Sequence, residues 1–125
     1  MADETVLIVE DNSLNRKLVE TLLRPDNYRL LIAVDGQEAI ETAAREKPDL
    51  ILMDMQLPQI SGYEATRILK SRPETAHITI VAVTAHAMDD EREQAAAAGC
   101  DGYIVKPIDT RTFARQVRQY LGLQD

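Results

Sequence analysis

The hydrophobic positions of this chain follow two patterns that alternate along it. Five short apolar runs, at residues 6–9, 29–34, 50–53, 78–83 and 103–105, are typical of β-strands buried on both faces. Between them lie longer stretches in which apolar residues recur every three or four positions, the spacing of an amphipathic helix. The alternation predicts five strands and five helices, and therefore a doubly wound α/β domain with a parallel sheet.

The predicted helices differ in the strength of their apolar stripes. The clear stripes are Leu14, Leu18 and Leu22 beside Val19 and Leu23, then Ala39, Ile40, Ala43 and Ala44, then Ala65, Ile68 and Leu69, and last Phe113, Val117, Tyr120 and Leu121. The remaining stretch, about residues 88–98, is mostly alanine and charge. Its helix propensity is high but its apolar face is weak, so few contacts are expected to hold it.

Cap and breaker residues mark the ends of the predicted helices. Pro48 and Pro73 are expected to stop the second and third helices. Gly99 is expected to end the fourth helix in a left-handed conformation. The turn at residues 24–27 is expected to end the first helix abruptly, away from any functional site. N-caps are predicted at Asn12 or Ser13, at Asp35 and at Asp109.

Composition and charge narrow the classes of protein to consider. The chain has 125 residues, the size of one domain, and its net charge of -7 argues against direct binding to nucleic acid. Its apolar runs are too short to span a membrane, and the sequence after Met1 lacks the basic and apolar regions of a signal peptide. Cys100 is the single cysteine, which excludes an internal disulfide and favours a cytoplasmic location.

Polar residues follow four of the predicted strands at their carboxyl ends. Glu10 and Asp11 come after the first strand and Asp54 after the third. Thr84 comes after the fourth strand and Lys106 after the fifth. Ligands of open α/β sheets bind at this edge, so three carboxylates, a hydroxyl and an ammonium are expected to converge on one pocket.

Each of these groups has a role in phosphoryl transfer. Clustered carboxylates repel one another and favour a bound cation, and oxygen ligands without His or Cys favour Mg²⁺, with Mn²⁺ as an alternative. Asp54 can act as a nucleophile and form an acyl phosphate. Lys106 can balance charge on the transferred group, and Thr84 can donate a hydrogen bond to it.

Taken singly, each polar residue also has an ordinary structural interpretation. Glu10 or Asp11 alone could be a helix cap, Lys106 alone a solvated surface lysine, and Thr84 alone a turn hydroxyl. Their common position at one edge of the sheet, after four different strands, favours the functional interpretation.

Four segments of the sequence resemble response regulator receiver domains. They are VLIVEDN at 6–12, LILMDMQLP at 50–58 followed by Ser61 and Gly62, VAVTA at 81–85, and GCDGYIVKP at 99–107. The resemblance covers the whole chain, 1–125, as one receiver domain, and is greatest to single-domain response regulators and to receivers of hybrid kinases. It implies a flavodoxin-like strand order of 2-1-3-4-5, which periodicity alone does not give.

The resemblance also implies roles for the residues at the sheet edge. Asp54 would be the phosphoacceptor of a phosphorelay, and Lys106 would pair with the phosphoryl group and be joined to Pro107 by a cis peptide bond. The magnesium ligands would be Asp11 and Asp54 directly, Glu10 through water, and the backbone carbonyl of Gln56. The protein would assist its own phosphorylation and dephosphorylation and would not otherwise be an enzyme.

Two further pairs of residues match positions that control signalling in this family. Thr84 and Tyr103 correspond to a switch pair. In this family the threonine moves toward the phosphoryl oxygens, and the tyrosine then turns inward. These movements would reshape the surface of the fourth helix, fifth strand and fifth helix. A half-buried structural tyrosine is the alternative for Tyr103. Gln56 and His86 match positions that flank the attacking water and tune dephosphorylation, and a solvent-facing loop histidine is the alternative for His86.

The implied partners are a sensor histidine kinase or histidine phosphotransfer protein and a downstream protein target, without direct contact with nucleic acid or membrane. The chain is expected to be a monomer, and dimerisation on phosphorylation is left open. Partner choice in this family depends mainly on the first helix and the loop after the fifth strand. In this chain that region includes Asn15, Arg16, Leu18, Val19 and Leu22.

Other classes of protein share parts of this pattern. A phosphatase of the haloacid-dehalogenase type would place Asp-x-Asp after the first strand, where this chain has Glu10 and Asp11 side by side. Turnover of a free phosphate ester would favour this phosphatase interpretation. A flavodoxin-type FMN carrier would need a glycine- and hydroxyl-rich loop there, and a colourless purified protein would argue against it. Met1 and the lack of a trailing linker favour a complete single-domain protein over a receiver excised from a hybrid kinase or transcription factor.

Overall fold

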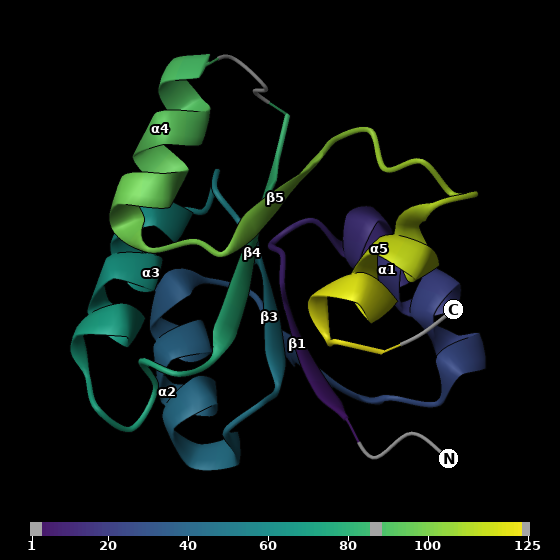
Figure 1. Cartoon of the computed structure of the whole chain (residues 1–125), viewed down its shortest axis with the longest axis horizontal. Helices are drawn as coiled ribbons and strands as arrows, with labels where there is room; N and C mark the ends of the chain where they lie inside the picture. Colours follow the sequence, from purple (N-terminus) through teal and green to yellow (C-terminus); the bar gives the residue numbers. More distant parts are fainter. Residues whose placement is uncertain (1–3, 86–88, 124–125) are drawn as a thin grey trace.

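A five-stranded parallel sheet forms the centre of the molecule (Figure 1). The computed structural model describes residues 4–85 and 89–123. The strand order is β2-β1-β3-β4-β5, which confirms the predicted doubly wound, flavodoxin-like arrangement. The strands are β1 (Thr5–Val9), β2 (Arg29–Ala33), β3 (Leu50–Asp54), β4 (Thr79–Thr84) and β5 (Gly102–Val105).

Helices cover both faces of the sheet. In Figure 1, α2, α3 and α4 lie on one face, and α1 and α5 lie together on the other. A short 3-10 helix, η1 (Arg24–Asp26), follows α1 and leads into β2. The α-helices are α1 (Ser13–Leu23), α2 (Gly36–Glu46), α3 (Gly62–Ser71), α4 (Asp89–Ala98) and α5 (Phe113–Tyr120).

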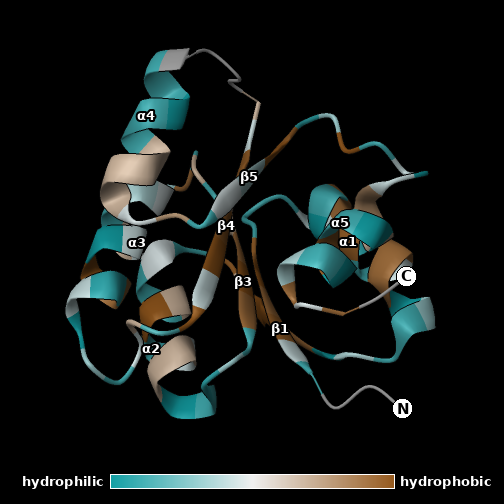
Figure 2. Ribbon diagram, viewed as in Figure 1, coloured by the Kyte–Doolittle hydropathy of each residue, from teal (hydrophilic) through white to brown (hydrophobic). Residues whose placement is uncertain are grey.

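The alternation of side chains along each strand divides the core into two parts. Leu7 and Val9 of β1 join the buried cluster on the α2 and α3 face. Val6 and Ile8 join the cluster that contains Phe113 and other residues of α1 and α5. Figure 2 shows the central strands β1 and β3 in the hydrophobic colours along most of their length, as expected for a sheet covered on both faces. A shift of one residue in register would exchange the two faces, so this pattern fixes how the strands pair.

Several predicted helix ends are confirmed. The side chain of Asn12 caps α1 by accepting a hydrogen bond from the Asn15 N–H at 3.0 Å, and the side chain of Asp35 caps α2 in the same way. Both α2 and α3 end two residues before a proline, and Gly99 after α4 has a φ of 109°. The Lys106–Pro107 peptide bond is cis, as the family resemblance implied.

The predicted cap of the last helix is wrong. The helix α5 begins at Phe113, and the residue before it, Thr112, makes no side-chain capping bond. Asp109 instead accepts a hydrogen bond from the Arg111 N–H at 2.9 Å, within the turn that precedes α5. The carboxylate therefore stabilises a turn and not the helix end, because three residues of turn separate it from Phe113.

The apolar stripe of α1 is also rotated from the predicted one. Val19 and Leu23 are buried in the core, whereas Leu14 is 76% exposed and Leu18 is 38% exposed. The outward leucines leave an apolar strip on the surface of α1. The strand boundaries differ from the prediction by one residue at six of the ten strand ends. For example, β2 stops at Ala33 and β4 starts at Thr79.

The helix α4 has few buried side chains. It begins at Asp89, and Met88, where the sequence suggested a start, lies outside the described residues. Among its described side chains only Ala95 and Ala98 are buried. Small buried residues give a helix little apolar area to hold it on the sheet, which agrees with the weak stripe in the sequence. No helix in the described parts of the chain is both long and apolar enough to cross a membrane.

Candidate functional site

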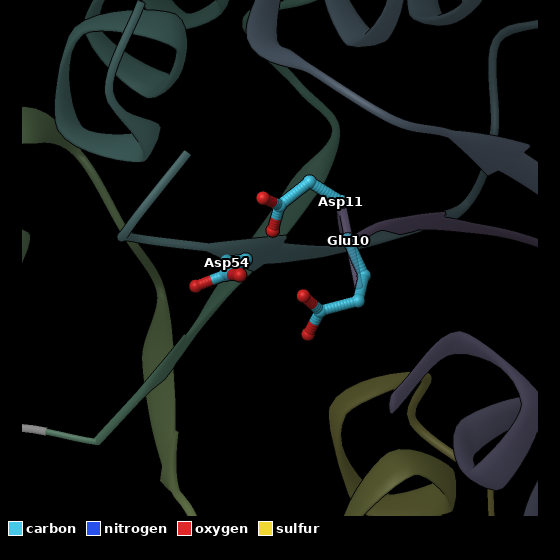
Figure 3. Close-up of side chains that lie close together, drawn as sticks. All are labelled: Glu10, Asp11 and Asp54. Atoms are coloured by element: carbon cyan, nitrogen blue, oxygen red, sulfur yellow. The ribbon is translucent and has the colours of Figure 1, made fainter. Parts of the chain in front are cut away.

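Three carboxylates meet at the carboxyl edge of the sheet (Figure 3). Asp54 is the last residue of β3 and is 3% exposed, and Glu10 directly follows β1 and is 5% exposed. Asp11 is exposed. One carboxylate oxygen from each residue lies within 4.8 Å of the others. The two strands are neighbours in the sheet, and this pairing brings together residues that are distant in sequence.

The period of the strands explains why three of the site residues share one side of the sheet. Glu10 stands two positions after Ile8, Asp54 two after Leu52, and Lys106 two after Ile104. The three apolar residues all belong to the core cluster on the α1 and α5 face. Side chains two positions apart on a strand point the same way, so the polar groups extend this face of the core past its edge.

Lys106 is the cation of the site. Its Nζ lies 3.0 Å from Glu10 Oε1 and 3.3 Å from Asp54 Oδ2. Its backbone N–H donates to the carbonyl of Thr84 at 2.7 Å, which holds the residue against the end of β4. The ammonium, which directly follows the edge strand β5, therefore bridges the two buried carboxylates on the same face of the sheet.

Burial and charge shift two of these groups away from their usual titration ranges. Burial raises the pKa of the Glu10 carboxyl, and the nearby carboxyl of Asp54 raises it further, while Lys106 acts against this. Burial works against the charged form of Lys106, but the hydrogen bond to Glu10 and the charge of Asp54 outweigh it and raise the pKa of Lys106. The lysine therefore stays protonated near neutral pH, and the carboxylates crowd one another enough to favour an additional cation.

Backbone N–H groups hold the two buried carboxylates in place. Asp54 Oδ1 accepts a hydrogen bond from the Gln56 N–H at 3.0 Å, and Glu10 Oε2 accepts one from the Asn12 N–H at 3.2 Å. The side chain of Gln56 is exposed beside them. Gly62 packs against the same loop, and a Cβ at this position would collide with the carbonyl of Asp54. The loop after β3 is thus closely packed under the site.

Thr84 and Tyr103 lie on the opposite face of the sheet from Glu10 and Asp54. Tyr103 pairs in register with Ala82, two positions before Thr84, so both side chains point toward the α3 and α4 side. Thr84 is buried, and Tyr103 is half-buried. The guanidinium carbon of Arg92, from α4, lies 4.6 Å from the centre of the Tyr103 ring. The geometry therefore agrees with the alternative of a half-buried tyrosine, and the switch role stays a prediction.

Three other residues named from the sequence fall away from this cluster or outside the described chain. His86 lies outside the described residues. His77 is exposed on the surface. Cys100 is half-buried, with its Sγ 3.9 Å from Thr66 Oγ1, and burial raises the pKa of its thiol. The thiol is therefore protonated at neutral pH and unreactive.

Two arginines near the site were not picked out as site residues from the sequence. Arg16 Nη1 donates to the carbonyls of Glu10 and Asp11, at 3.0 and 3.1 Å. Arg92 lies over Tyr103. The position of Arg16 in the first turn of α1 could have indicated this contact from the sequence. Helical side chains lean toward the helix N-terminus, and so toward the residues that precede the helix. Arg92 has no such local signal, since its partner comes from another element.

Comparison with known proteins identifies the family. Residues 6–118 match the response regulator receiver domain family. This chain is a response regulator receiver domain. The receiver is 44% identical over 119 residues to the polar-differentiation response regulator DivK of Brucella anthropi, and the alignment covers 95% of this chain and 97% of that relative. It therefore functions as a phosphoacceptor in two-component signalling, and receiver domains are in general not true enzymes.

Solved structures agree with this assignment. The receiver domain of the sensor histidine kinase PA1611 of Pseudomonas aeruginosa PAO1 has a TM-score of 0.88 and 36% identity, covers 97% of this chain and 99% of that one, and has a magnesium ion coordinated in its active-site cleft. A Saccharomyces cerevisiae complex of the histidine phosphotransfer protein Ypd1 with the receiver domain of Ssk1 matches with a TM-score of 0.85 and 30% identity, over 94% of this chain and 88% of that one.

The acidic trio of this receiver fits a magnesium ion. All three side chains offer carboxylate oxygens, two of them are buried, and one oxygen from each lies within 4.8 Å of the others. Hard divalent cations prefer such oxygen ligands, and Mg²⁺ commonly binds through one or two carboxylates while it keeps several waters. The chemistry of the site therefore agrees with the ion in the related structure.

Proposed function

We propose that Asp54 of this receiver accepts a phosphoryl group from a phosphohistidine of a sensor kinase or histidine phosphotransfer protein. The observation that carries the proposal is the position of Asp54. Its carboxylate is buried at the strand end, and it is paired with the ammonium of Lys106 and flanked by Glu10 and Asp11. A buried carboxylate with a fixed cation and a fixed N–H donor suits in-line attack on phosphorus.

The proposed step exchanges one bond to phosphorus for another. A carboxylate oxygen of Asp54 attacks the phosphorus, an O–P bond forms, and the P–N bond of the phosphohistidine breaks as the imidazole leaves. The Gln56 N–H holds Asp54 Oδ1, so the orientation of the nucleophile is fixed before the donor arrives. Lys106 already lies 3.3 Å from Asp54 Oδ2 and is charged, so it can pair with the phosphoryl oxygens without a large movement.

Asp11, Asp54 and the backbone carbonyl of Gln56 would hold Mg²⁺ directly in this proposal, and Glu10 would do so through water. Bound Mg²⁺, or Mn²⁺ in its place, would neutralise charge on the phosphoryl oxygens. The receiver's own residues would do the remaining work, since Glu10 holds Lys106 at 3.0 Å and Asp54 supplies the nucleophile. The domain would thus assist its own phosphorylation and hydrolysis without turning over a separate substrate.

Phosphorylation of Asp54 would change the surface of the domain through movements of Thr84 and Tyr103. In the proposal, Thr84 donates a hydrogen bond to the phosphoryl group, and Tyr103 then turns inward and alters the surface formed by α4, β5 and α5. The shared face of the two side chains supports this coupling, as does the small buried area of α4. A downstream protein would bind that surface and so read the phosphorylated state.

The phosphodonor partner would bind the exposed leucines of α1 beside the active site. A hollow lined by Asn15, Leu18, Lys106, Pro107 and Ile108 joins α1 to the loop after β5, which is the region expected to select partners. Val19 is buried in the core and therefore does not belong to this surface. Apolar side chains are typical of the central part of a protein interface, and polar groups are typical of its rim.

The lifetime of the phosphoryl group would depend on Gln56 and His86. The exposed side chain of Gln56 lies near Asp54, where it can influence the attacking water. Replacing each residue by alanine and timing phosphate loss tests this, and unchanged lifetimes in both variants would reject it. Residues 1–125 would form one cytoplasmic receiver domain that is monomeric before phosphorylation.

The proposed function is tested by incubating the whole chain with acetyl phosphate and Mg²⁺ and measuring intact mass. A single phosphate adduct is expected that forms with Mg²⁺ and does not form when Mg²⁺ is chelated. Asp54→Asn should abolish the adduct, whereas Asp90→Asn, which changes an exposed carboxylate of α4, should keep it. An adduct of equal yield in Asp54→Asn would reject Asp54 as the acceptor.

A further inference from the structure

A guanidinium from α1 holds the backbone that carries two of the three carboxylates. Arg16 Nη1 donates to the carbonyl of Glu10 at 3.0 Å and to the carbonyl of Asp11 at 3.1 Å. We propose that Arg16 is a positioning residue of the cation site, which fixes the carboxylates of Glu10 and Asp11 relative to Asp54. This inference rests on the proposed function, in that the trio is taken to bind Mg²⁺.

The segment that Arg16 holds connects two regular elements. The Glu10 N–H still bonds to Ala33 of β2 at 3.0 Å, and α1 begins at Ser13 with Asn12 as its cap. Glu10 and Asp11 therefore span the short gap between strand and helix. Neighbouring side chains of an extended chain diverge, so their carboxylates can face one cation only if the backbone of this gap is held in one conformation.

The contact of Arg16 differs from an ordinary surface interaction. A charged donor to a carbonyl makes a stronger hydrogen bond than a neutral one, and the two N–H groups of Nη1 lie in the guanidinium plane, so they can hold two acceptors at a fixed spacing. Arg16 itself is half-buried, and its backbone N–H is committed to the first turn of α1 through the carbonyl of Asn12. One residue thus joins the helix to the two residues that precede its cap.

Arg16 can affect a divalent cation in two opposite ways. Its fixed positive charge repels the cation, so charge alone predicts tighter Mg²⁺ binding when Arg16 is removed. Its positioning of the carboxylates predicts weaker binding instead, and residues that orient metal ligands typically contribute about 10- to 100-fold in affinity. We expect positioning to dominate, because both bonds are made to the backbone carbonyls of the two residues that carry the carboxylates. The direction of the change therefore separates the two roles.

The experiment is calorimetric titration of the whole chain with MgCl₂. Arg16→Met should weaken Mg²⁺ binding about 10-fold, and Arg16→Lys, which keeps the charge but lacks the planar pair of donors, should weaken it by a smaller factor. Lys17→Met is the matched control, since it removes the same charge from the next residue of α1, which is exposed. That control should bind Mg²⁺ at least as tightly as the unmodified chain.

The titration results separate the positioning role of Arg16 from the binding of Mg²⁺ itself. Unchanged or tighter binding in Arg16→Met would overturn the positioning role while the proposed function stands. Absence of Mg²⁺ binding by the unmodified chain would instead overturn the cation site of the proposed function. Thermal melting without Mg²⁺ checks that each variant is folded. If Arg16→Met does not fold, Arg16→Lys decides, and binding equal to that of the unmodified chain then rejects the inference.

Discussion

The ammonium of Lys106 lies 3.3 Å from Asp54 Oδ2, and the same nitrogen lies 3.0 Å from Glu10 Oε1. All three side chains are largely buried, so their charges act on one another with little screening. Removing one member of such a group is costly, because the others are left buried without a partner. The cation of this site is thus in place before any phosphoryl group arrives.

Replacing Lys106 by Met should slow phosphorylation without removing the acceptor. Loss of the fixed cation should lower the rate of labelling by acetyl phosphate by about 100-fold, which is the scale for removing one charged or hydrogen-bonding group from a transition state. Intact mass at a series of times measures the rate. Lys17→Met, an exposed lysine of α1, should label at the normal rate. A normal rate in Lys106→Met would show that the cation takes no part in transfer.

Replacing Arg92 by Met should uncouple α4 from Tyr103. The guanidinium carbon lies 4.6 Å from the ring centre, a contact worth about 0.5–1 kcal/mol at an exposed position. A double-mutant cycle with Tyr103→Leu, measured by urea unfolding, should give a coupling of this size. In the Tyr103→Leu background, Arg92→Met should cost no further stability. Additive losses in the two single variants would mean that the contact contributes nothing.

Placing a side chain at Gly62 should loosen the loop beneath Asp54. The new Cβ would collide with the carbonyl of Asp54 and lie 2.7 Å from the Cα of Met55, so the loop must move. Gly62→Ala should therefore lower the free energy of unfolding by about 1–3 kcal/mol. It should also slow labelling of Asp54, whose carboxylate depends on the N–H of this loop. Equal stability and an equal labelling rate would show that the loop adapts freely.

Tyr28 should make the protein less stable at high pH. Burial, followed by the charge of Asp26, raises the pKa of Tyr28 to about 12 from its usual value of about 10. The unfolded chain therefore releases this proton first, and the stabilisation is complete below pH 10 and is lost as the pH rises toward 12. The contribution of Tyr28 should fall by about 1 kcal/mol between pH 9.5 and pH 11. Urea unfolding across this range measures it, and Tyr28→Phe should have the shallower slope. Parallel slopes would contradict the shifted pKa.

Much of the fold could be predicted because local and global preferences agree. The apolar runs and helical stripes give the elements, and Asn12 and Asp35 cap their helices because the capping bond spans only three residues. Asp109 failed as a cap because the same side chain can serve a turn, and only the three-dimensional path of the chain selects between them. The strand order came from the family resemblance, since periodicity says nothing about which strands are neighbours.

The site was predictable at the level of residues but not of contacts. Glu10, Asp54 and Lys106 each stand two positions after a residue of one core cluster, and this signal is present in the sequence once the strands are assigned. The bonds of Arg16 and the position of Arg92 depend on where helices lie relative to the sheet, and no local pattern encodes that. The outward turn of Leu14 likewise follows from the rotation of α1 on the sheet.

Locating the phosphoryl group in the labelled chain shows whether Asp54 is the phosphoacceptor. The chain is labelled with acetyl phosphate and Mg²⁺ and then reduced with borohydride, which converts an acyl phosphate side chain of aspartate to homoserine. Peptide fragmentation then identifies the reduced residue. We expect homoserine at position 54 and unaltered Asp11. Reduction at Asp11, or a phosphate adduct retained on another residue with Asp54 unaltered, would contradict it.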